Sequence, residues 1–252
     1  YTYRDDRRRA TARQSGTAYA DYGDGSANSE SIYYRYNYNF RGELIEAVGY
    51  LGTDVNSTAT PLSGRFHEYS YDGAGNRTTS NPTGDNTTLK GDPNDPQNLL
   101  YVTSHDSNKL NQIEDRENPF LSVSGTVQSA ASGVSVDGLA AGKQGGHWSG
   151  EAFLSNGSGP AADSISVKAI KAGTPDTGEN GSVLGVIAPD PEDLEYDEDG
   201  NLIEDGKWDY TFNQRNQLIK MTSTLPSTGS FLTVDRYELE FVYDYLGRRV
   251  EK

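Results

Sequence analysis

The sequence contains no cysteine, one methionine and three histidines in 252 residues. The absence of cysteine excludes disulfides, thiolate metal sites, iron–sulfur clusters and thiol nucleophiles. Aliphatic and phenylalanine side chains are also scarce, since Leu, Ile, Val and Phe together account for only 46 residues. The longest smooth apolar run, residues 183–188, is far shorter than the roughly 18 residues that a spanning helix needs. We therefore expect no membrane span.

Basic residues are few, with 22 Lys and Arg against 37 Asp and Glu, for a net charge of −15. Nucleic-acid binding requires clustered Lys and Arg, so this balance disfavours a nucleic acid as partner. Low apolar content with high net charge is typical of disordered chains. The 17 Tyr and two Trp argue against disorder, because such large rings are costly to leave unburied. We therefore expect an ordered chain that relies on tyrosine rather than leucine.

Tyrosine and arginine divide the chain into three parts. All 17 Tyr lie in residues 1–101 or 196–252, and no Arg occurs between Arg116 and Arg215. Two compositions in one chain indicate two building plans. We predict a β-sheet segment at 1–117, an inserted module at 118–190 and a second β-sheet segment at 191–252; whether residues 102–118 belong to the sheet or to a hinge stays open. With no Met and no targeting signal at its start, the sequence predicts a piece of a longer polypeptide or a processed product.

The outer parts share a nine-residue frame: aromatic, any residue, aromatic, Asp or Asn, two further residues, Gly or Asn, any residue, then Leu or Arg. Copies begin at Tyr36, Tyr69, Leu194, Tyr210 and Phe241, and a degraded copy begins at Tyr1. Aromatics two residues apart on a strand point to the same face. Asp or Asn starts a turn, and Gly tolerates the positive φ of a tight hairpin. Each copy predicts a β-hairpin that must stack on its neighbours to bury its aromatic face.

We assign a structural role to the aromatic and turn residues of this frame, and we predict that the rings form a ladder that holds the sheet together. These residues are Tyr36, Tyr38, Gly42, Tyr69, Tyr71, Asp72, Gly75, Tyr196, Asp197, Gly200, Tyr210, Phe212, Asn213, Tyr243, Asp244 and Gly247.

The middle part shows apolar–polar alternation over residues 120–127, 133–138 and 164–169. Alternation with turn signals about every ten residues is typical of a small antiparallel β-sandwich. No segment predicts a long helix. The expected fold class is therefore all-β, with antiparallel hairpin repeats in a curved or spiralling sheet, interrupted by the small sandwich.

Residues 71–77 and 243–249, with the pattern Tyr-Asp-x-x-Gly followed by Asn-Arg or Arg-Arg, resemble the RHS/YD-repeat family. This family includes bacterial Rhs proteins, the C components of Tc toxin complexes and the teneurins. The run 196–206 is an especially close match, and the resemblance covers residues 30–115 and 191–252. It implies hairpins that wind in a continuous spiral into a large hollow shell. The insert resembles the immunoglobulin-like modules that interrupt YD repeats in large bacterial surface proteins.

The resemblance implies a structural, non-enzymatic segment of an exported protein, secreted or at the surface of a bacterium. Its hairpins would form a tyrosine-stacked β wall, in a shell or a scaffold, with the rest of a longer parent chain or copies of itself as partner. Neither the family's self-cleaving aspartyl segment nor a toxin tail is present, so the resemblance does not extend to toxin delivery. A first alternative is a self-associating extracellular filament that pairs through sheet edges. A second is an adhesion module that binds carbohydrate or a cell-surface protein through the insert or through exposed rings, for which Tyr33 or Tyr34, and Tyr245, are candidates.

Catalytic patterns are missing from the sequence. His67, His105 and His147 show no metal-binding spacing. Neither a nucleophile elbow nor a phosphate-binding glycine loop with Lys occurs. We therefore expect a protein that is not an enzyme and has no cofactor. Turnover that is lost on mutating Asp197 or His147 would overturn this expectation.

One acidic cluster, residues 190–199, holds seven carboxylates. Glu195, Asp197 and Asp199 are weak candidates for calcium, since hard cations prefer several oxygens from a tight turn. An EF-hand register fails, because it would place Gly206 where the loop requires Glu. The simpler interpretation is that Asp197 and Gly200 are turn residues of the repeat and that the rest is a solvated linker.

Overall fold

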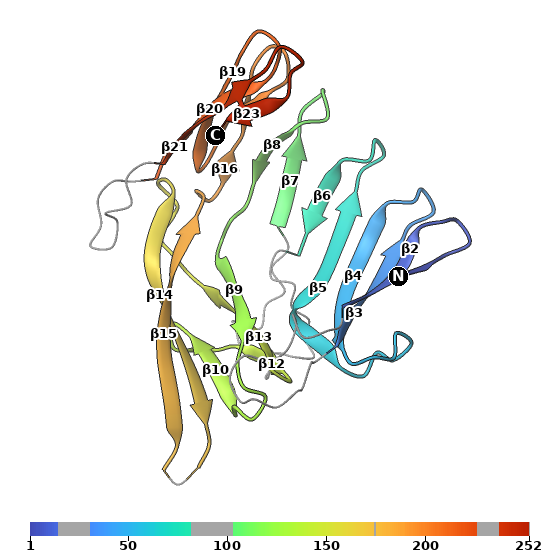
Figure 1. Ribbon diagram of the computed structural model, residues 1–252, viewed down its shortest axis with the longest axis vertical. Coiled ribbons are helices and arrows are strands. Elements are labelled where there is room, and N and C mark those ends of the chain that lie inside the picture. The colour runs from blue at the N-terminus through green and yellow to red at the C-terminus, as the bar shows by residue number, and fades with distance from the viewer. Residues whose placement is uncertain (15–30, 82–102, 174, 226–236, 252) are drawn as a thin grey trace. The chain divides into compact units, whose positions relative to one another are not determined.

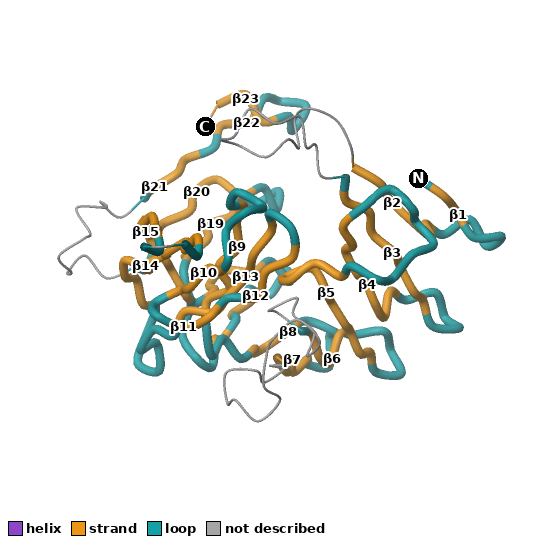
Figure 2. The backbone as a smooth tube through the Cα atoms, turned by 90° about the horizontal axis from the view of Figure 1, so that it is seen from below, coloured by secondary structure: helices purple, strands orange, loops and turns teal. Residues whose placement is uncertain are grey.

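The computed structural model describes residues 1–14, 31–81, 103–173, 175–225 and 237–251. Every regular element in these residues is a β-strand and none is a helix, as Figure 2 shows. The strand pairs in this part of the chain are antiparallel. The predicted all-β, antiparallel fold class is therefore confirmed. A helix long and apolar enough to cross a membrane is absent from the described residues.

The chain divides into two compact units. Unit 1 comprises Tyr1–Ser104, Ser122–Ala152 and Ile165–Val183, and unit 2 comprises His105–Leu121, Phe153–Ser164 and Leu184–Lys252. Each unit therefore contains hairpin repeats and part of the insert. The predicted domain boundaries after residues 117 and 190 stay a prediction.

The repeats of unit 1 form consecutive antiparallel strands that lie side by side in chain order (Figure 1). They are β1 (Thr2–Tyr3), β2 (Arg9–Gln14), β3 (Ile32–Tyr38), β4 (Leu44–Leu51), β5 (Pro61–Tyr71), β6 (Arg77–Ser80) and the first two residues of β7 (Thr103–Ser107). Register shifts occur just before the turns, between Asn37 and Tyr38 and between Ser70 and Tyr71. Each hairpin therefore carries an irregularity next to its turn.

The repeats of unit 2 continue in the same antiparallel manner. Their strands are the rest of β7, β8 (Ile113–Arg116), β16 (Glu192–Asp193), β17 (Glu195–Tyr196), β18 (Leu202–Asp205), β19 (Trp208–Phe212), β20 (Leu218–Ser223), β21 (Glu238–Glu240), β22 (Val242–Tyr243) and β23 (Arg249–Glu251). Strand β8 lies between β7 and β16, strands β17 to β21 form a sheet in chain order, and β22 pairs with β23.

In the described part of the insert, seven strands form two sheets, ordered β11-β10-β14-β15 and β12-β13-β9. The strands are β9 (Leu121–Thr126), β10 (Gly133–Val136), β11 (Leu139–Ala140), β12 (Gly142–Gln144), β13 (His147–Ala152), β14 (Ala161–Lys171) and β15 (Thr177–Ile187). Within unit 1, Gly150 of β13 faces Val136 of β10: a Cβ atom on Gly150 would lie 3.0 Å from Cγ2 of Val136. The missing side chain thus lets the two sheets approach closely.

The aliphatic core is small, as the composition indicates. Tyr33 is fully buried, and its ring stacks on that of Tyr50 with 5.3 Å between the ring centroids. The Tyr33 hydroxyl donates a hydrogen bond to the carbonyl of Ser57. Tyr33 is therefore a core residue and offers no surface to a partner. Tyr245, by contrast, is 85% exposed, as its position in a turn predicts.

Candidate functional site

Seven hairpin turns in the described residues share one backbone geometry. We number each turn from the Asp or Asn of the frame as position one; the aromatics before it are positions minus two and zero, and the Leu or Arg after it is position six. The residues at position one are Arg4, Asn39, Asp72, Asn108, Asp197, Asn213 and Asp244.

Two backbone hydrogen bonds close every one of these turns. The amide of position one donates to the carbonyl of position five, and the amide of position four donates to the carbonyl of position one, at 2.8–3.3 Å between N and O. Position four has a positive φ in all seven turns, at Arg7, Gly42, Gly75, Asn111, Gly200, Asn216 and Gly247. Glycine and asparagine tolerate this conformation best, which explains their recurrence at this position.

The side chain at position one caps the turn in the six copies that have Asp or Asn there. Its Oδ1 atom accepts hydrogen bonds from the amides of positions three and five. In the Asp72 turn both distances are 2.8 Å, from the nitrogens of Ala74 and Asn76. The same pair of bonds occurs in the turns of Asn39, Asn108, Asp197, Asn213 and Asp244. Only a short side chain with an acceptor oxygen meets this requirement, which is why Asp and Asn recur.

Positions one and five form a matched donor–acceptor pair in all six capped turns. Where position one is Asp, position five supplies a donor: Asp72 accepts from Asn76 Nδ2 at 2.8 Å, and the pairs Asp197–Asn201 and Asp244–Arg248 behave alike. Where position one is Asn, its Oδ1 is occupied by backbone amides and its Nδ2 donates. Position five then supplies an acceptor, in the pairs Asn39–Glu43, Asn108–Gln112 and Asn213–Gln217.

This pairing lowers the pKa of the turn aspartates. The pKa of Asp72 and that of Asp197 lie below the ordinary value chiefly because the side chain of position five donates to the carboxylate, and the backbone amides add to this. For Asp244 the backbone amide of Arg248 contributes most. These carboxylates are therefore committed to their own turns.

Tyrosine at position zero links three of the hairpins to the hairpin that precedes each of them. The tyrosine hydroxyl donates to the carbonyl of position six in the preceding hairpin, at 2.9 Å for Tyr71 to Leu44, Tyr196 to Ile113 and Tyr243 to Leu218. Phe212 occupies the same position and lacks the hydroxyl. Tyr71, Tyr196 and Tyr243 thus act through directional hydrogen bonds between hairpins.

Arginine at position six makes a contact within its own hairpin. Its guanidinium lies over the aromatic ring of position minus two, 4.5 Å from the centroid for Arg77 over Tyr69. The same arrangement joins Arg9 to Tyr1 and Arg249 to Phe241. Cation–π contacts of this kind favour Arg at position six of these three turns.

Position five also contacts the next turn along the sheet. A Cβ atom on Gly42 would lie 2.2 Å from the guanidinium of Arg8, which is position five of the preceding turn. Glu43, Gln112 and Gln217 lie in the same way within 3.1–3.3 Å of the Cβ positions of Gly75, Gly200 and Gly247. In these four turns glycine at position four suits this close approach as well as the positive φ.

One hairpin that the frame did not identify lies at residues 105–113, between β7 and β8. Its turn runs from Asn108 to Gln112 with all the bonds described above. The frame misses it because His105 and Ser107 replace both aromatics. Residues 103–116 therefore belong to the repeat sheet, which answers the question left open by the sequence.

A buried polar network lies in unit 2 where the insert leaves and rejoins the repeats. Glu192 has no exposed surface, and it is the register partner of Arg116 on the neighbouring strand. Its carboxylate accepts two bonds from the Arg116 guanidinium, one from Asn118 Nδ2 at 2.7 Å and one from the Gly206 amide at 3.2 Å. The expectation of a solvated linker is wrong for Glu192, because its side chain is buried and hydrogen-bonded. The neighbouring sequence does not indicate this, since Arg116 lies 76 positions away.

The network determines the charge state of Glu192. Burial by itself would raise the pKa of this carboxyl, but the hydrogen bonds and charge of Arg116, with the bonds from Asn118 and Gly206, hold it below the ordinary value. The adjoining pair is Asp205 and Tyr210, whose hydroxyl donates to Asp205 Oδ2 at 2.7 Å. The pKa of Tyr210 is raised, first by burial and then by that bond and the negative charge of Asp205.

The calcium candidates do not form a ligand set in the described part of the chain. Asp197 uses both carboxylate oxygens within its own turn. Glu195 lies on β17 opposite Glu204. Among the described residues, no three His, Asp or Glu side chains gather as a metal site requires.

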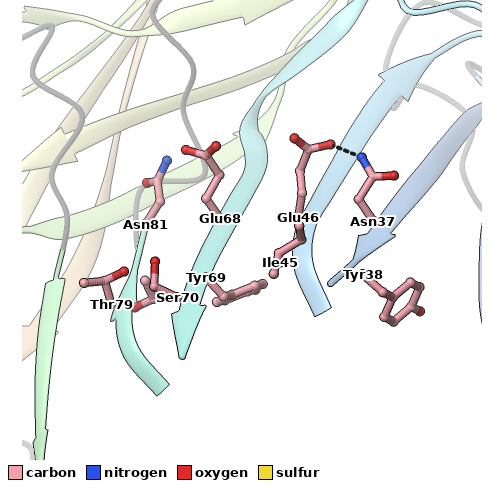
Figure 3. Close-up of a pocket in the computed structure, with 10 residues that line it drawn as sticks. Asn37, Tyr38, Ile45, Glu46, Glu68, Tyr69, Ser70, Thr79 and Asn81 are labelled. Carbon is pink, nitrogen blue, oxygen red and sulfur yellow. Dashed lines mark hydrogen bonds between the residues drawn. The ribbon is translucent and has the colours of Figure 1, made fainter. Parts of the chain in front are cut away.

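A polar hollow of about 700 Å³ lies over strands β3 to β6 of unit 1 (Figure 3). Asn37, Glu46, Glu68 and Asn81 project together from neighbouring strands in this view, and Asn37 Nδ2 donates to Glu46 Oε1 at 2.7 Å. Glu46 and Glu68 are direct register partners. Like charges in that position are unfavourable, so the hollow suits a ligand that donates hydrogen bonds.

Comparisons with known proteins add little to this geometry. No protein-family model matches the sequence, and no curated protein matches it. Among solved structures, the chain is similar to one titled "Crystal Structure of TcdB2-TccC3-TEV", with a TM-score of 0.27 and 11% sequence identity over 86% of this chain. The match covers 10% of that other chain, so this chain spans about a tenth of its length. A TM-score of this size does not decide the fold.

Proposed function

We propose that this chain is a structural, non-enzymatic segment of an exported RHS/YD-repeat protein, in which stacked hairpins form a β wall. One observation carries the proposal: tyrosine hydroxyls at position zero bond to the carbonyl of position six in the preceding hairpin in three separate copies. Because the same bond recurs between successive hairpins, it supports a role in holding the hairpins of the wall together. A ligand-binding site would be expected at a single place in the chain. The side chains at positions one and five bond to each other within their own turns, which supports a structural role for them.

The proposal is tested by removing single hydroxyl groups. Tyr71→Phe, Tyr196→Phe and Tyr243→Phe each remove one link without changing the ring. We expect each to lower the free energy of unfolding by about 0.5–1.5 kcal/mol in a denaturant titration. Tyr245→Phe is the matched control, because Tyr245 is 85% exposed in its turn. Equal effects for all four variants would refute the role of the hydroxyls as links.

The form of the wall is tested on native material by electron microscopy. Closed hollow particles would support a shell in which this chain is one panel, with the rest of a longer parent chain as partner. Ordered filaments would support the alternative of a self-associating subunit instead. Turnover of any substrate that is lost on substituting Asp197 or His147 would contradict the non-enzymatic part of the proposal.

A second candidate function, adhesion through carbohydrate, is favoured by the polar hollow of unit 1. Carboxylates and amides side by side accept and donate hydrogen bonds to vicinal hydroxyl groups. The Glu68 side chain is exposed, and its carboxylate has no hydrogen bond or ion pair within the described residues, whereas its backbone carbonyl accepts a bond from the Asn81 amide. A sugar that binds there would raise the unfolding temperature of the chain. That shift should disappear in Glu68→Ala and persist in Glu198→Ala, a control at an exposed turn residue of unit 2.

A further inference from the structure

Four polar side chains form one row across the polar hollow of unit 1. Asn37 of β3 is the register partner of Glu46 of β4, and Glu46 is the register partner of Glu68 of β5. Asn81 follows β6 and continues the row, because its backbone amide donates to the carbonyl of Glu68 at 3.1 Å. The row therefore runs amide, carboxylate, carboxylate, amide, and Figure 3 shows the four side chains projecting in one direction.

The two carboxylates at the centre of the row have no cation paired with them. Glu46 accepts a bond from Asn37 Nδ2 at 2.7 Å, and neither Glu46 nor Glu68 forms an ion pair with Lys or Arg in the described part of the chain. Lys and Arg are also absent from the described residues that line the hollow. Like charges directly opposite each other destabilise a sheet. Local conflicts of this kind are expected at functional sites.

The tyrosine rings of the hollow are already in contact with arginines. Arg8 lies over the ring of Tyr38, 5.7 Å from its centroid, and Arg77 lies over the ring of Tyr69 at 4.5 Å. The ring faces that the guanidinium groups cover are closed to a sugar ring. Recognition of a ligand in the hollow therefore depends on the carboxylates and the amides.

We propose that the hollow binds a protonated primary amine that is flanked by hydroxyl groups, as in an amino sugar. The inference rests on the adhesion function proposed for the hollow and names its ligand class. An ammonium group has three N–H donors and no acceptor. Between Glu46 and Glu68, it would reach both carboxylates through charge-assisted bonds of about 2.7–2.9 Å, since opposed side chains have Cβ atoms about 4.5–5.5 Å apart. The side-chain amides of Asn37 and Asn81 would lie on either side, where they can exchange hydrogen bonds with the hydroxyl groups.

The test uses the full chain at low ionic strength, since salt screens exposed charges. The isotope-labelled chain is titrated with D-glucosamine, D-glucose and N-acetyl-D-glucosamine, and its amide chemical shifts are followed. We expect shifts at residues 37–38, 45–46, 68–70 and 79–81. Glucosamine should bind roughly tenfold more tightly than the other two sugars, because it alone carries a charged amine.

The variant Glu68→Gln keeps the shape of the side chain and removes one charge. It should weaken the binding of glucosamine about tenfold and leave the binding of glucose nearly unchanged. It should also raise the unfolding temperature of the chain without ligand, because the like-charge pair is gone. Glu198→Gln, at an exposed turn residue of unit 2, is the matched control and should change neither quantity comparably. Weaker binding together with a lower unfolding temperature would make Glu68 a structural residue and overturn the proposal.

Three other outcomes also overturn the proposal. Equal binding of glucosamine and glucose means that the amine is not selected, and the adhesion function then stands with a neutral sugar. Absence of shifts with all three sugars at about 10 mM, tenfold above a millimolar Kd, means that both the ligand class and the adhesion function are wrong. Shifts of the same residues with calcium chloride that disappear in Glu68→Gln make a hard cation the occupant.

Discussion

The Glu192 network offers the most direct test of how the insert is fixed to the repeats. Arg116→Met removes the guanidinium and keeps an unbranched apolar stem of similar length. Two of the four donors to the Glu192 carboxylate are then lost, and Asn118 and Gly206 still donate. Glu192→Gln is the complementary change, since it keeps the shape and removes the charge.

The expected magnitudes follow from the burial of the two partners. Glu192 is fully buried, so leaving its charge without Arg116 is costly, in the range of about 3–5 kcal/mol for a buried pair broken on one side. We expect the lower end, about 3 kcal/mol, because two donors remain. Glu192→Gln should cost about 1.5–3 kcal/mol, since the Arg116 side chain is 36% exposed and water can solvate it. The double variant should cost less than the sum of the single ones.

The pH dependence of the free energy of unfolding is an independent test of the Glu192 network. In the native protein the folded pKa of Glu192 is lowered, so its contribution is present above the unfolded pKa and is lost as pH falls through the folded value. Without Arg116, burial dominates and raises the folded pKa above the unfolded one. The stability of Arg116→Met should then fall as pH rises above about 4.3, the ordinary value for Glu. The difference in the free energy of unfolding between the native protein and Arg116→Met therefore widens from pH 4 to pH 7.

Denaturant unfolding followed by tryptophan fluorescence measures both effects. Trp208 lies in unit 2 and Trp148 in unit 1. A Trp148→Phe background makes the signal specific to unit 2, where the network lies. An Arg116→Met loss below about 1 kcal/mol at pH 7, well under the buried-pair range, would refute the reasoning. A difference in the free energy of unfolding that stays constant between pH 4 and pH 7 would refute the reasoning as well.

Three further predictions concern the repeats. Phe212→Tyr adds the missing hydroxyl at position zero and should raise the free energy of unfolding by about 0.5–1.5 kcal/mol; no gain would show that the link needs more than the hydroxyl. Gly206→Ala should cost about 1–3 kcal/mol by the same titration, because its Cβ would lie 2.2 Å from Cδ of Pro189; a neutral result would mean that the backbone yields. Asn76→Asp sets two carboxylates against each other and should lower the unfolding temperature, while Asp72→Asn with Asn76→Asp restores the pair; calorimetry that shows no recovery would contradict the matched pairing.

Local features of the fold were predictable from the sequence. Asp or Asn followed by Gly three residues later determines a turn through bonds within five residues, so the hairpins at residues 36–44, 69–77 and 241–249 follow from the frame. The hairpin at residues 105–113 escaped because its aromatic positions hold other residues, although Asn108 and Asn111 retain the turn chemistry. A search for the turn alone, without the aromatics, would have found it.

Non-local contacts were not predictable in the same way. Glu192 sits in a run of acidic residues that indicates a solvated linker, and nothing near it in sequence identifies Arg116 as its partner. The match between positions one and five is visible in the sequence, but its meaning depends on knowing that Oδ1 is already occupied by backbone amides. Only the structure shows which side-chain atom remains free to pair.

The contacts between hairpins explain how a chain poor in Leu, Ile, Val and Phe can form an ordered sheet. Tyrosine hydroxyls, matched turn pairs and arginines over rings are directional, and each joins groups in one hairpin or in two adjacent ones. In repeat proteins, stability is approximately a sum of nearest-neighbour terms. The aliphatic core can therefore stay small, and each hairpin depends on its immediate neighbours far more than on the chain as a whole.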